Sequence, residues 1–149
     1  MSTTIEDAVR ALARGIYPTE AGTELLIRQG RAIYRGAPWI TELDAGSDSG
    51  PGMASIDVDA LLYESGAWSG GEQRVVRIAA SLLGGPAVDL SEEVPGLDRE
   101  NLALVLAALA HANGSHEHSG VETTPDGRPI RFVRLTSLYP WPETERATR

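Results

Sequence analysis

The chain has 149 residues, a formal net charge of −8 and no cysteine. Its length fits one domain of ordinary size, and the missing cysteines exclude disulfides, thiolate metal sites and cysteine nucleophiles. The acidic charge is concentrated in residues 37–98, which hold eleven acidic residues and two arginines. This balance opposes non-specific binding to nucleic acid and to anionic membranes.

The N-terminal segment MSTTIEDAVRALARG carries acidic residues near its start and lacks the apolar stretch of a secretory signal. The longest apolar run, LALVLAALA over residues 102–110, is too short to span a bilayer. We therefore expect a soluble cytoplasmic protein with no membrane partner.

Hydrophobic periodicity predicts two helices near the N-terminus. The first covers about residues 4–14. The second covers about residues 19–35, and Gly36 and Pro38 are its stop signal.

The hydrophobic pattern in the middle of the chain predicts three more helices, separated by loops. They are expected over about residues 57–65, 70–83 and 98–113. The stretch GAPWITEL (36–43) fits either a short strand or a helical turn, and residues 44–52 form a loop rich in Gly, Ser and Asp. The last of the three helices is apolar on every side from Leu102 to Ala110. It is therefore predicted to be the central helix of the core.

The pattern changes in VETTPDGRPIRFVRL, which predicts two short strands around a Pro-Asp-Gly turn. The predicted fold is mainly α: a single domain of about five helices over residues 1–138, with a small C-terminal β-hairpin near 121–135. Residues 139–149 are expected to form an extended tail.

Residues 69–101 resemble a stretch of ABC-type ATPases: SGGEQRVVRIAASLLGG is similar to the signature loop and the helix that follows it, and PGLDREN is similar to the D-loop. The resemblance implies nucleotide contacts from Ser69, Gly70, Gly71 and Glu72. However, the chain has no lysine and no GxxxxGK[ST] loop, which such an ATPase needs to hold the phosphates. A nucleotide-binding accessory subunit, capping a nucleotide held by a partner chain, is the alternative that remains.

The same residues also have a purely local explanation. Ser69 suits the N-cap of a helix, and Glu72 then lies in the first turn, where the helix dipole favours a negative charge.

A longer pattern, SGGE…RIAASL…GLD…N preceded by ELLIRQGRAIYR, resembles a set of small uncharacterised bacterial proteins. The resemblance covers about residues 20–113. It implies a shared fold unit and no particular activity.

All histidines of the chain fall in HANGSHEHSGVE, residues 111–122. His111, His116 and His118 are candidate zinc ligands, because zinc accepts imidazole nitrogen together with carboxylate oxygen. A metal-dependent enzyme or a metal-binding protein is therefore one alternative. A solvated loop after a helix, with no cofactor, is the other.

Basic and aromatic side chains suggest a contact surface. The arginines at positions 28, 31 and 35 would share one face of the second helix, and aromatic anchors are common at interfaces. The candidate partner-binding residues are Arg28, Arg31, Arg35, Trp68, Tyr139 and Trp141. A tail that folds back onto its own core is the other explanation for the last two. We expect a non-enzymatic binding, adaptor or regulatory protein that contacts a protein partner or a second copy of itself.

Overall fold

The computed structural model describes residues 4–43 and 52–143. The predicted loop over 44–52, apart from Gly52, and the end of the predicted tail lie outside the described residues. The described part is mainly helical, with six α-helices and two antiparallel sheets of two strands each. This is one helix more than predicted, because the four-residue helix that follows Asp89 was not expected.

The helices of the described part are α1 (Ile5–Ala13), α2 (Tyr17–Gln29), α3 (Val58–Glu64), α4 (Gly70–Leu82), α5 (Leu90–Glu93) and α6 (Arg99–Asn113). Three 3-10 turns are η1 (Ser65–Ala67), η2 (Val94–Gly96) and η3 (Ser115–Glu117). The strands are β1 (Ile40–Leu43), β2 (Met53–Ile56), β3 (Ser119–Thr123) and β4 (Pro129–Arg134).

Helix α2 lies at the centre of the helical body and packs against α1, α4 and α6. Its side chains Ala21, Leu25 and Leu26 have no exposed surface. The prediction that the helix after Asp98 is central is wrong, because Leu106 and Leu109 of α6 are 38% and 43% exposed. Helix α6 covers one side of α2 and leaves part of its own apolar surface uncovered.

The predicted second helix is too long. Helix α2 ends at Gln29, because Gly30 adopts a left-handed conformation with φ of 90°, which terminates a helix. Arg31 and Arg35 therefore lie beyond the helix. The predicted common helix face of the three arginines is not formed.

The ambiguous segment 36–43 contains a strand. β1 pairs antiparallel with β2, so that Ile40 lies opposite Ile56. β2 also packs against α1. This small sheet was not predicted, since each strand has four residues, too few to show clear alternation.

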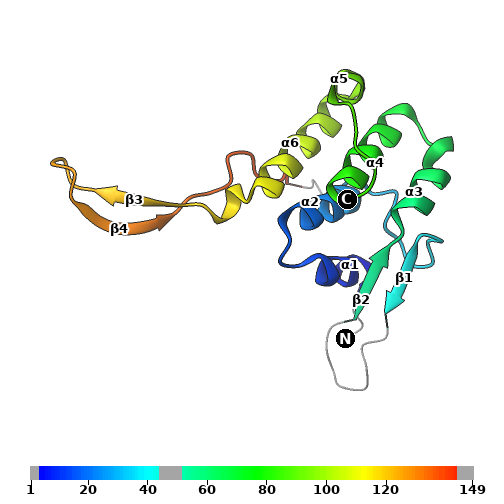
Figure 1. The fold of residues 1–149 in the computed structure, drawn as a ribbon, viewed down its shortest axis with the longest axis horizontal. Helices are drawn as coiled ribbons and strands as arrows, with labels where there is room; N and C mark the ends of the chain where they lie inside the picture. Colours follow the sequence, from blue (N-terminus) through cyan, green and yellow to red (C-terminus); the bar gives the residue numbers. More distant parts are fainter. Residues whose placement is uncertain (1–3, 44–51, 144–149) are drawn as a thin grey trace, which may run out of the picture.

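The predicted C-terminal hairpin is confirmed. β3 pairs antiparallel with β4, and Val121 lies opposite Phe132. We call residues 119–134 the arm, because the two strands stand out from the helical body beyond the end of α6 (Figure 1). The contacts of each strand are mainly with the other strand.

Within residues 4–43 and 52–143, no helix combines the length and the apolar character that crossing a membrane requires.

Candidate functional site

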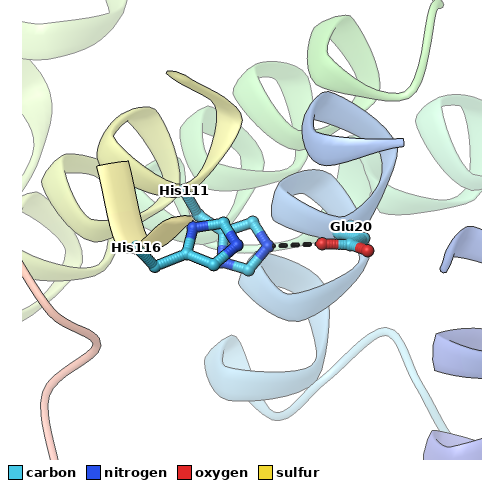
Figure 2. A group of neighbouring side chains, drawn as sticks. All are labelled: Glu20, His111 and His116. Atoms are coloured by element: carbon cyan, nitrogen blue, oxygen red, sulfur yellow. Dashed lines mark hydrogen bonds and ion pairs between the residues drawn. The ribbon is translucent and has the colours of Figure 1, made fainter. Parts of the chain in front are cut away.

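Two of the three predicted metal ligands come together with a residue that the sequence did not indicate. His111 in the last turn of α6 and His116 in η3 stack their rings, with centroids 4.0 Å apart (Figure 2). Glu20 of α2 places its Oε1 atom 2.8 Å from His111 Nε2. His118 is exposed and is not a member of this cluster. We call Glu20, His111 and His116 the histidine cluster.

Gly114 positions the two histidines relative to each other. It ends α6 with φ of 85°, so the chain turns sharply and η3 brings His116 over His111. A side chain at position 114 would be strained by this backbone, and its Cβ would come within 2.8 Å of the Tyr17 ring. Tyr17 packs edge-on against both imidazoles.

The electrostatic environment favours an ionised carboxylate beside a neutral imidazole. Burial alone would raise the pKa of Glu20, but hydrogen bonds from the Gly15 N–H and His111 outweigh it and hold the pKa below its usual value. Burial, followed by the nearby His111, lowers the pKa of His116. At neutral pH, His116 is therefore uncharged and keeps a free lone pair.

The segment after the arm returns to this cluster. The Trp141 indole N–H points at His111 Nδ1, at 3.4 Å. The Arg28 guanidinium lies 5.1 Å from the centroid of the Trp141 ring and donates a 2.9 Å hydrogen bond to the Pro142 carbonyl. Leu138 N–H donates to Ser115 Oγ. This part of the tail is therefore docked on α2, α6 and η3.

Two cavities open beside the docked tail. One, of about 270 Å³, is lined by residues of α1 and α2 that include Arg10, Glu20 and Glu24. The other, of about 470 Å³, is lined by both clustered histidines and by tail residues that include Tyr139. His111 and Trp141 line both cavities.

Glu24 links the two N-terminal helices beside the smaller cavity. It accepts hydrogen bonds from Arg10 Nε at 2.8 Å and from Arg28 Nε at 2.9 Å. Burial alone would raise the pKa of Glu24, but the bonds and charges of the two arginines outweigh it and lower the pKa.

When the pKa of a carboxyl group is lower in the folded protein than in the unfolded chain, the ionised group stabilises the fold at pH values above its unfolded-state pKa. This stabilisation is lost as the pH falls through the folded-state pKa. We therefore expect Glu24→Gln to lower the free energy of unfolding at pH 7 by about 1–2 kcal/mol. Below a pH of about 4 the difference from the wild type shrinks. Urea unfolding at a series of pH values measures this, with the exposed Glu64→Gln in α3 as control. A pH-independent difference would contradict the assignment.

The stretch that resembles an ATPase signature loop is engaged in local contacts. Ser69 accepts a hydrogen bond from the Glu72 N–H, and the Glu72 carboxylate accepts one from the Ser69 N–H, which together form a capping box. This confirms the local explanation. Arg31 Nη1 lies 2.7 Å from Glu72 Oε1, and Gly71 packs near Asn101. Gly70 opens α4 at its first position.

The predicted partner-binding residues make contacts within the chain. The Arg31 guanidinium lies 4.6 Å from the centroid of the Trp68 ring, and the Arg28 guanidinium lies 5.1 Å from the centroid of the Trp141 ring. Arg35 forms an ion pair with Glu42 of β1. Two of the predicted arginines are thus paired with the predicted tryptophans, and their role in partner binding stays a prediction.

The arm exposes an apolar surface that the sequence analysis did not single out. Phe132 is 83% exposed, its cross-strand neighbour Val121 is 49% exposed and Ile130 is 58% exposed. The next cross-strand pair, Glu122 and Arg131, points to the opposite face and forms an ion pair. The alternation of apolar residues with arginine in PIRFVR was the signal for a strand with one apolar face.

Comparisons with protein-family models, with curated proteins and with solved structures find no match for this chain. The two resemblances stated above therefore stay predictions, and the function has to be inferred from the geometry.

Proposed function

We propose that this protein is a non-enzymatic binding protein that acts through protein–protein contacts. Its contact surface is the apolar face of the arm, formed around Val121 and Phe132, and the occupant of that face is a second copy of the chain. The observation that carries the proposal is the 83% exposure of Phe132 in a strand whose contacts are mainly with the other strand of the arm.

The stability of the arm supports a covered state. A two-stranded hairpin is marginally stable by itself in water, and it needs further strands or a packing surface for independent stability. Here the aromatic residue and its β-branched cross-strand neighbour face solvent. Covering both side chains would stabilise the complex by about 25 cal/mol for each Å² of apolar surface that is buried. A partner that packs against this face would therefore stabilise the hairpin itself.

The distribution of charge favours a second copy. The whole chain carries −8, so two copies repel each other over most of their surface. The arm, residues 119–134, carries two acidic residues and three arginines, so its net charge is only +1. The arm is therefore a region where two copies can approach with little repulsion. A twofold axis would place the apolar face of one arm on that of the other, as in most small homodimers.

The proposal treats residues 1–138 as one domain from which the arm projects, followed by the tail 139–149. Leu138, four positions after the arm, is a further apolar side chain that is 90% exposed. The docked part of the tail is then part of the body and not of the contact surface.

Phe132→Glu is expected to convert a dimer into a monomer, because it places a charge at the centre of the proposed contact. Sedimentation equilibrium of the wild type should give twice the chain mass of 15.9 kDa. The dissociation constant of the variant dimer should be at least about 10-fold higher than that of the wild type. Tyr63→Glu is the matched control, since it makes a similar aromatic-to-acid change at an 85% exposed site on α3, away from the arm (Figure 1).

A wild type that stays monomeric up to millimolar concentration would overturn the proposal. Equal dissociation of both variants would place the contact elsewhere. Capture of a different protein by a monomeric wild type, lost in Phe132→Glu, would keep the arm as the surface but replace its occupant.

A further inference from the structure

We infer that Glu20, His111 and His116 form a zinc site, and that zinc binding and docking of Trp141 on His111 exclude each other. This inference is independent of the proposed self-association, because it uses residues of the helical body and the tail and none of the apolar face of the arm.

The donor set suits zinc. Each of the three residues offers one ligand atom, and these atoms all lie within 4.8 Å of one another. Two imidazole nitrogens and one carboxylate oxygen form a zinc set that leaves the fourth tetrahedral position open. Zinc bonds of about 2.0–2.2 Å place tetrahedral donor atoms about 3.4 Å apart. The cluster must therefore contract when the metal enters.

The contraction is available from His116. The His116 ring lies nearly parallel to the His111 ring, at an interplanar angle of 18°. The ring of His116 therefore has to turn before its nitrogen lone pair points at the position of the metal ion. Within the described part of the chain, His116 Nδ1 is a buried atom without a hydrogen-bond partner. Rotation of this side chain breaks no hydrogen bond at that atom. The adjoining cavity of about 470 Å³ leaves space for a water molecule or another fourth ligand.

The tautomer of His111 links the metal to the tail. An indole N–H can only donate, so Nδ1 accepts from Trp141 and the neutral ring carries its proton on Nε2, where it points at Glu20. A metal on Nε2 requires the opposite tautomer, with the proton on Nδ1. Two N–H groups would then face each other. Zinc binding therefore removes the acceptor of Trp141 and releases this contact.

The remaining tail contacts determine how far the release goes. Arg28 holds both the Trp141 ring and the Pro142 carbonyl. These contacts do not depend on the tautomer of His111. We therefore expect the indole to move out of contact with the histidine while the tail stays near α2, which changes the lining of both cavities.

Zinc titration of the metal-free full-length protein by calorimetry tests the site. We expect one zinc per chain, and at least about 10-fold weaker binding in both His116→Ala and Glu20→Gln. His118→Ala is the matched control, because this exposed histidine lies outside the cluster. Absence of saturable binding, or an equal loss in His118→Ala, would overturn the site. Circular dichroism of each variant identifies any loss that is due to unfolding.

A second variant tests the link to the tail. Trp141→Phe keeps an aromatic ring but removes the N–H donor, so it is expected to bind zinc about 5–10-fold more tightly. Zinc should also change the tryptophan fluorescence of the wild type but not that of Trp141→Phe. Unchanged or weaker zinc binding in Trp141→Phe would overturn the mutual exclusion, and intact binding in this variant would leave the site itself supported.

Discussion

Leu25→Ala is expected to lower the free energy of unfolding by about 2–5 kcal/mol, whereas Leu106→Ala costs less than about 1.5 kcal/mol. Leu25 has no exposed surface at the centre of α2, and Leu106 of α6 is 38% exposed. The first substitution leaves a cavity between packed helices. The second removes a side chain that already lies partly in water.

Urea unfolding measures both free energies. The two variants are matched, because each shortens a leucine to alanine in the interior of a helix. Both should be made in a Phe132→Glu background, which keeps self-association out of the comparison. Equal losses would contradict the central position of α2, and a larger loss in Leu106→Ala would mean that α6 is the central helix, as its composition alone had predicted.

Gly22→Ala is expected to destabilise the protein by about 1–3 kcal/mol. Alanine favours a helix interior over glycine by up to about 1 kcal/mol, so helix propensity alone predicts the opposite sign. A Cβ at position 22 would lie 2.8 Å from the Ala79 carbonyl oxygen and 2.9 Å from Leu83 Cγ. The leucine side chain can rotate, but the carbonyl belongs to the backbone of α4. The two helices would have to move apart.

Gly70→Ala is the control for this substitution, because a Cβ at that helical position meets nothing within 4 Å. Thermal unfolding of both variants should show a lower Tm for Gly22→Ala alone. Glu20 lies in the same helix, two positions before Gly22, and its carboxylate lies 2.8 Å from His111. Displacement of α2 should therefore weaken zinc binding as well. A stabilised Gly22→Ala would show that α2 and α4 can separate at low cost.

Local signals in the sequence predicted several elements correctly. Asp98 caps α6 by accepting a hydrogen bond from the Asn101 N–H, and Gly114 ends the same helix in a left-handed conformation. Ser69 caps α4, and the Pro-Asp-Gly turn joins the strands of the arm. These features depend on residues within a few positions of each other, so neighbouring residue types are enough to predict them.

The composition of the histidine cluster could not be predicted in the same way. The sequence placed His111 and His116 near each other, because only four residues separate them. It offered His118 as the third ligand because of its proximity in sequence. Glu20 is 91 positions away from His111, and only the packing of α2 against α6 brings it there.

The arginines show how one helix end alters a predicted surface. A helix continuing to Arg35 would place Arg28, Arg31 and Arg35 on one face, but the left-handed Gly30 ends it and sends the last two in other directions. The prediction used Gly36 and Pro38 as the stop signal, but the helix ends earlier, at Gly30. Ile33 and Trp39, which follow that end, are buried in the core.

The sequence by itself determined the mainly helical class, the caps of α4 and α6, the hairpin and the acidic character of the chain, because each depends on local residue order or on composition. Tertiary structure decided that α2 is central, that Glu20 joins the histidines, that Trp141 docks on His111 and that Phe132 faces solvent. These features depend on contacts between segments far apart in the chain. Many such arrangements satisfy the same local preferences, and close packing of the whole chain selects among them.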